Sequence, residues 1–180
     1  MVSDNLNWSE FSRINLFNKF LNSGPLLLLY YLSISEIDTN LEKTFDIFTF
    51  NLPIIIIYFW ILKRPSVMGT GHIFVAGLIN DVVMGFPLGI SSLSYLVVCF
   101  VSNYVRNKSV NTTIASDWFT FFIALIFANL LFFSLLNNFS DIVISYSKIS
   151  YNTFFTLFLF PIFWLLFSLY QSNFIGGQDA

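Results

Sequence analysis

Asp81 is the residue of this sequence whose type and setting most suggest chemistry, because it is a lone carboxylate in the apolar stretch 77–96. A carboxylate at the centre of a membrane helix costs at least about 2.5 kcal/mol on insertion scales, so it marks a candidate functional site by default. Three interpretations stay open. Asp81 could tie or cap the two helices beside it, take part in a partner contact or conformational change, or form a proton, ion or solute site.

Other residue types that carry chemistry are scarce. An enzyme needs a nucleophile with a base, a carboxylate pair or a metal constellation within reach of one another. The chain has one histidine, His72, and one cysteine, Cys99. His72 and Asp81 are about 13 Å apart along a regular helix and cannot touch there, so His72 is interpreted as an interfacial hydrogen-bonding residue. We therefore expect no enzymatic activity, no metal and no cofactor.

The overall composition is that of an integral membrane protein. Of the 180 residues, 56% are hydrophobic and only 10% are charged, against roughly 25% charged residues in soluble domains. The mean hydropathy is +0.74, and 24 phenylalanines exceed what a soluble core of this size buries. A net charge of −2 with eight Lys or Arg offers no basic stripe for nucleic acid. The expected environment is the lipid bilayer.

Apolar stretches predict an all-α, polytopic fold with six transmembrane helices, all in one integral membrane domain over residues 1–180. Gly85-Phe86-Pro87-Leu88-Gly89 breaks one long stretch into a helical hairpin, because Gly and Pro end helices; a re-entrant loop is the alternative. The first span is the weakest, so five spans are also possible. The predicted spans are approximately 17–35, 45–62, 69–85, 88–105, 117–136 and 152–171.

Loop charges predict the orientation of these spans, because Lys and Arg concentrate on the cytoplasmic side. With the N-terminus inside, six cations are inner and two, Lys43 and Lys148, are outer. Both termini are therefore expected in the cytoplasm. This orientation places Tyr30 at the outer interface and His72 near the inner end of its span. Pro53 and Pro161 are expected inside spans, where neighbouring helices compensate the lost hydrogen bond.

The surroundings of Asp81 favour helix packing over catalysis. Gly77, Asp81 and Gly85 recur at every fourth position, so they share one stripe of a helix. Small residues on such a stripe allow close approach of a neighbouring helix. Asn80 and nearby serines supply side chains that could hydrogen-bond the acid.

The same stretch resembles the core of a known family. GLIND at 77–81, followed by GFPLG at 85–89, is similar to the "G-x-x-x-D-x-x-x-G-x-P-L-G" core of the bacterial MreD family of rod-shape-determining membrane proteins. The resemblance covers about residues 24–172. Gly77, Asp81, Gly85, Pro87 and Gly89 correspond to core-motif positions, for packing or partner contact, and no catalytic residue is implied.

What this resemblance implies is a non-enzymatic scaffold subunit of the cell-elongation machinery in the bacterial inner membrane. Such proteins work with MreC, and with MreB, RodA and a class B penicillin-binding protein, in peptidoglycan synthesis. The family is also similar in architecture to the substrate-binding subunits of energy-coupling-factor (ECF) vitamin transporters. A small-solute-binding subunit is therefore the alternative function, because fold does not fix function. A lipid-modifying enzyme, with Asp81 acting beside another acid, is a third.

Overall fold

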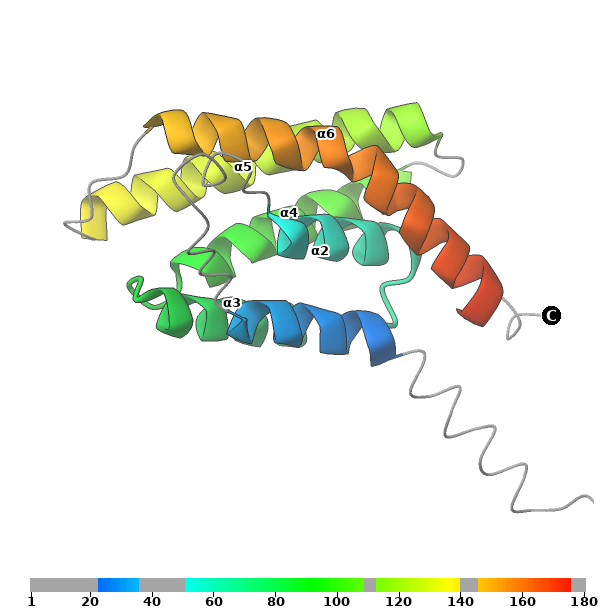
Figure 1. Ribbon diagram of the computed structural model, residues 1–180, viewed down its shortest axis with the longest axis horizontal. Coiled ribbons are helices and arrows are strands. Elements are labelled where there is room, and N and C mark those ends of the chain that lie inside the picture. Colours follow the sequence, from blue (N-terminus) through cyan, green and yellow to red (C-terminus); the bar gives the residue numbers. More distant parts are fainter. Residues whose placement is uncertain (1–22, 36–50, 109–112, 140–145, 176–180) are drawn as a thin grey trace, which may run out of the picture.

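The described part of the chain is entirely helical, as the sequence predicts. A computed structural model describes residues 23–35, 51–108, 113–139 and 146–175, and these ranges contain helices and no strand (Figure 1). The first described helix is Ser23–Ile34. The others are α2 (Leu52–Lys63), α3 (Thr70–Met84), α4 (Ile90–Lys108), α5 (Ile114–Phe139), α6 (Tyr146–Tyr170) and a terminal π-helix, η1 (Gln171–Ile175).

Two of these helices are long and apolar enough to cross a membrane by length and composition alone: α5, and the segment Ile149–Asn173 that contains most of α6. The Ser23–Ile34 helix, α2 and α3 are shorter apolar helices. The six-span topology therefore stays a prediction. Residues 1–22 and 36–50, which hold the front of the predicted first span and the start of the second, lie outside the described residues.

The central helix of the fold is α2. Each of its residues from 54 to 62 is at most 5% exposed, as expected for a helix that is apolar on every side. It packs on α4 and α6, and Figure 1 shows it in cyan among the other helices. With 12 residues it is about 18 Å long, which is less than the roughly 30 Å hydrocarbon thickness of a bilayer.

The start of α2 corrects the prediction for Pro53. This proline lies in the first turn of α2 rather than in the helix interior. At that position its missing N–H removes no helical hydrogen bond. The side chain of Asn51 caps the turn by accepting the N–H of Ile54 at 3.3 Å. The N–H of Asn51 donates to Thr156 Oγ1 at 2.9 Å, so α2 begins against the middle of α6.

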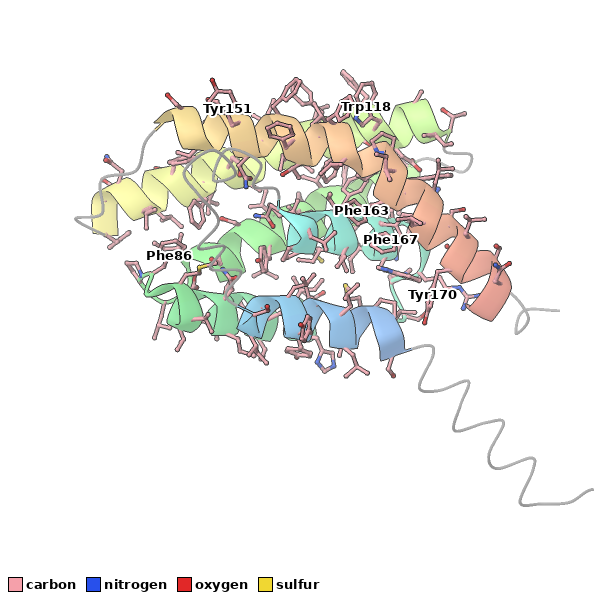
Figure 2. The ribbon with its side chains drawn as sticks, in the orientation of Figure 1. Phe86, Trp118, Tyr151, Phe163, Phe167 and Tyr170 are labelled. Carbon is pink, nitrogen blue, oxygen red and sulfur yellow. The ribbon has the colours of Figure 1, made fainter. Side chains whose placement is uncertain are left out.

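Pro161 does lie inside a helix, and α6 bends part-way along its length (Figure 1). Proline has no N–H to give to the carbonyl four residues earlier, which is that of Leu157. The indole Nε1 of Trp118, on α5, donates to this carbonyl at 3.0 Å; Figure 2 shows Trp118 beside α6. The prediction that a neighbouring helix compensates the proline is confirmed for Pro161.

Beyond the bend, α6 covers α2 with aromatic side chains. The Phe167 ring lies 5.4 Å from that of Phe59, and the Tyr170 ring lies 6.2 Å from that of Trp60. Figure 2 shows Phe163, Phe167 and Tyr170 on this part of α6. These contacts close the core around α2.

The predicted depths of Tyr30 and His72 cannot both be right. The Tyr30 hydroxyl and His72 Nδ1 are hydrogen-bonded at 3.1 Å, so the two side chains lie at one level of the bundle. The prediction that placed Tyr30 at the outer interface and His72 near the inner end is therefore wrong for at least one of them. This prediction was weak because few charged residues constrain the depth of the first span in the bilayer.

Candidate functional site

The carboxylate of Asp81 links the end of α3 to the start of α4. Its Oδ2 accepts the backbone N–H of Gly89 and its Oδ1 accepts that of Ser91, both at 2.8 Å. The first N–H groups of a helix have no partner within the helix, and negative charge is stabilising beside them. Asp81 is completely buried, so these two hydrogen bonds lie inside the protein.

The turn between the two helices is set by two glycines. Gly85 has φ 67° and Gly89 has φ 103°; these are the positive-φ residues in the described ranges. At the end of α3 the N–H of Phe86 donates to the carbonyl of Asp81 at 2.9 Å, the bond that closes a left-handed helix end. The same residue, Asp81, thus ends one helix through its backbone and caps the next through its side chain.

Phe86 also attaches this turn to α5. Its ring meets that of Phe132 edge-on, with centroids 5.6 Å apart, and Figure 2 shows Phe86 at the turn. Aromatic pairs prefer such edge-to-face arrangements. The hairpin is therefore joined to a third helix at its tip.

At Gly77 the backbones of α3 and α4 lie in close contact. A β-carbon on Gly77 would lie 2.4 Å from the Cα of Ser92 and 2.7 Å from its backbone N. Ser92 Oγ donates to the carbonyl of Phe74 at 3.1 Å, and Asn80 Nδ2 donates to Ser91 Oγ at 3.1 Å. Gly85, in contrast, has no atom within 4 Å of the β-carbon position, so its contribution is conformational rather than a close contact.

The residues around Asp81 are those expected from the sequence, but the partners of the carboxylate differ. Polar side chains were predicted to hydrogen-bond Asp81, whereas the two bonds to the carboxylate come from backbone N–H groups. Asn80 and Ser91 bond each other instead. His72 bonds Tyr30. Within the described ranges, no group of three or more His, Cys, Asp or Glu could hold a metal ion.

Comparison with known families identifies the family of this chain. The family model described as rod shape-determining protein MreD matches residues 19–170. The chain belongs to the MreD family. Curated proteins and solved structures give no match.

Membership of the MreD family gives the chain its general role. It is a rod-shape-determining protein of the bacterial inner membrane, and the apolar helices fit a membrane location. The family is one of structural, shape-determining membrane proteins rather than of enzymes. The resemblance that the 77–89 stretch indicated is confirmed.

This MreD-family chain has a second buried acid, Asp117, at the first residue of the predicted span 117–136. Asp117 lies in the first turn of α5 and is completely buried. Its Oδ2 lies 3.0 Å from Lys63 Nζ, at the end of α2, and accepts Trp164 Nε1 of α6 at 3.1 Å. Three helices therefore meet at one carboxylate.

Tyr58 extends this second cluster along α2. Its hydroxyl donates to the Asp117 carbonyl at 3.2 Å and also hydrogen-bonds Thr120. The Lys63 ammonium lies 5.5 Å from the centroid of the Trp164 ring, which adds cation–π attraction. The sequence signal for this cluster was the position of Asp117 and of the Lys63-Arg64 pair, which lie at the same end of two predicted spans.

Proposed function

We propose that this chain is a six-helix scaffold of the cell-elongation machinery that binds an MreC-like membrane protein, with both termini in the cytoplasm. The observation that carries the proposal is the MreD family match over residues 19–170. The excess of cations on one side of the predicted spans supports the orientation. MreB, RodA and a class B penicillin-binding protein are further partners in the proposal.

In this proposal the core motif acts by giving the α3–α4 hairpin one fixed shape. Asp81 is buried and both of its oxygens are bonded, so it acts on a partner through the shape of the turn rather than by contact. Gly77 sets the spacing of the two helices, and Gly85, Pro87 and Gly89 form the turn.

The surface offered to the partner in this proposal is the tip of the hairpin. Leu88 in the turn is 71% exposed, and Val82 and Met84 in the last turn of α3 are 67% and 44% exposed. An exposed apolar group on a rigid turn is suited to a partner helix or to the membrane-proximal part of a partner. In the proposed orientation this tip lies at the outer face of the membrane.

Neither other function considered has support from the structure or the comparisons. The likeness to ECF vitamin-transporter subunits has no support, since no solved structure matches. A lipid-modifying reaction at Asp81 would need a carboxylate that a substrate can reach, whereas Asp81 is completely buried and holds two backbone N–H groups.

The test is co-purification with the MreC-like protein of the same cell, using Leu88→Asn. Phe139→Asn is the matched control, because Phe139 is 70% exposed and ends α5 at the same end of the bundle as the hairpin (Figure 1). We expect Leu88→Asn to lose the partner and to keep its thermal unfolding midpoint, while the control keeps both. Retention of the partner by Leu88→Asn would exclude the tip as the contact surface. If the unaltered chain fails to co-purify and its depletion leaves rod shape intact, the scaffold function is wrong.

A further inference from the structure

One face of α4 is not covered by the other described helices. Along this face the side chains change from apolar to phenolic to charged. Phe100 is 73% exposed and Tyr104 is 53% exposed, and Lys108 is exposed as well. These residues are spaced by four, so they lie on one face of the helix. The opposite face, with Tyr95, Cys99 and Ser102, is buried.

The order of groups along this face matches that of a phospholipid. From Phe100 to Lys108 the helix rises about 12 Å. Over that distance the exposed side chains change from a hydrocarbon ring to a phenol and then to an ammonium group. Tyrosine is enriched at the headgroup level of bilayers, and long cationic side chains reach outward to the phosphates.

Lys108 and Tyr104 converge on one another. Lys108 Nζ lies 4.9 Å from the centroid of the Tyr104 ring. The neighbouring Tyr104 side chain raises the pKa of Lys108, and a lysine ammonium is charged at neutral pH in any case. Because an ammonium has three N–H donors, it keeps donors for a ligand, and the phenol keeps its O–H.

The charges around this end favour an anionic ligand. Among the described residues the cations at this end are Lys63, Arg64, Arg106 and Lys108. The one acid there, Asp117, is buried and paired with Lys63. Lys108 makes no ion pair with any residue that the structure describes. Basic groups at the cytoplasmic ends of membrane helices attract anionic lipids.

We propose that Tyr104 and Lys108 hold the phosphate of an anionic phospholipid of the inner leaflet, with an acyl chain along Phe100. The site rests on the orientation given in the proposed function, which places the end of α4 at the cytoplasmic face. An anionic headgroup is preferred over a zwitterionic one, because the cationic amine group of the latter would repel Lys108. Lys108 donates to a phosphate oxygen, and the phenol O–H donates to a second.

General attraction of cations to the inner leaflet is the competing explanation, and charge-matched variants separate the two. Lys108→Gln removes one charge from the site. Arg64→Gln removes one charge from the same end of the molecule, at the C-cap of α2 rather than on α4. Tyr104→Phe removes only the hydroxyl and leaves every charge in place.

The experiment uses the purified full-length chain, stripped of lipid, in a neutral detergent. Binding of phosphatidylglycerol, phosphatidylcholine and inorganic phosphate is measured by native mass spectrometry. We expect phosphatidylglycerol to bind preferentially and Lys108→Gln to weaken it more than about tenfold, as for a lost charge-assisted hydrogen bond. Tyr104→Phe should weaken it about fivefold, the effect of one hydrogen bond. Arg64→Gln should weaken it no more than the about fivefold of a cation near an anionic surface.

Two results would overturn the lipid site. Equal weakening by Lys108→Gln and Arg64→Gln, with no effect of Tyr104→Phe, would show general electrostatic attraction only. Inorganic phosphate binding with the same dependence on the variants, and no preference for phosphatidylglycerol, would identify a free-anion site instead. Since lipid binding is measured without any partner protein, failure here leaves the co-purification test of the scaffold function unaffected.

Discussion

Gly77 lies so close to Ser92 that a β-carbon on it would be 2.4 Å from the Cα of Ser92. The clash is with backbone, which a side-chain rotation cannot relieve. This contact defines the spacing of α3 and α4 one turn from the residue, Asp81, that caps α4. Spacing and capping are therefore two parts of one hairpin.

Substituting Gly77 tests that spacing. Gly77→Ala should lower the free energy of unfolding by about 1–3 kcal/mol, the usual effect of overpacking, and so lower the thermal unfolding midpoint in detergent. Gly71→Ala is the control, because nothing lies within 4 Å of its β-carbon position; alanine should there raise helix stability by about 0.5–1 kcal/mol. Equal unfolding midpoints for Gly77→Ala and Gly71→Ala would show that α3 and α4 move apart easily to accept the added methyl group.

Removing the charge of Asp81 should destabilise the hairpin more than removing its serine neighbour. In Asp81→Asn, one of the two N–H groups of Gly89 and Ser91 would face an amide NH₂ group instead of an acceptor. The expected loss is about 1.5–3 kcal/mol, as for hydrogen bonds to charged groups. Ser91→Ala keeps the backbone N–H and loses only a neutral bond to Asn80, at about 0.5–1.5 kcal/mol. Both are measured as unfolding midpoints, and the reverse order would contradict the capping role.

Trp118 and Pro161 should be energetically coupled through the Leu157 carbonyl. Trp118→Phe removes the donor to that carbonyl, and the expected loss is about 0.5–1.5 kcal/mol for one hydrogen bond. Pro161→Ala supplies a helical N–H to the same oxygen. In the double variant Trp118→Phe should therefore have a much smaller effect, and the difference is measured with a double-mutant cycle. Additive effects would mean that the indole bond contributes nothing specific at the bend.

Removing the charge of Lys63 should destabilise the protein more than removing the charge of Asp117. Lys63→Met leaves a completely buried carboxylate without its cation, for which about 3–5 kcal/mol is expected. In Asp117→Asn the Lys63 side chain, already 22% exposed, can turn toward solvent, so the loss should be smaller. Unfolding midpoints of both variants and of the double variant provide the comparison. A larger effect of Asp117→Asn would contradict this asymmetry.

The fold class and the hairpin could be predicted because both depend on local chemistry. Long apolar stretches require helices in lipid, and Gly and Pro within 85–89 end one helix before the next begins. The structure accordingly ends α3 at Met84 and starts α4 at Ile90. The motif Gly77–Asp81 was also visible as a helical stripe, since its members are close in sequence.

What could not be predicted depends on contacts between distant segments. The bond between Trp118 and Leu157, and the meeting of Lys63, Asp117 and Trp164, join helices whose relative rotation no local pattern determines. For Asp81, the pattern indicated that the residue lies on a buried helix face. It did not indicate that the hydrogen-bond donors to the carboxylate would be backbone N–H groups rather than side chains. The start of α2 at Asn51, against Thr156, is of the same kind.

The complete burial of α2 has a consequence for how the chain is assembled. Ribosomes make α2 before α4 and α6, yet these two later helices pack against it. Residues 54–62 are at most 5% exposed in the finished bundle, so α2 lacks its packing partners until α4 and α6 are made. Biogenesis should therefore finish with the C-terminal helix closing over α2, and chains truncated before residue 146 should be degraded in the cell even though most of the sequence is present.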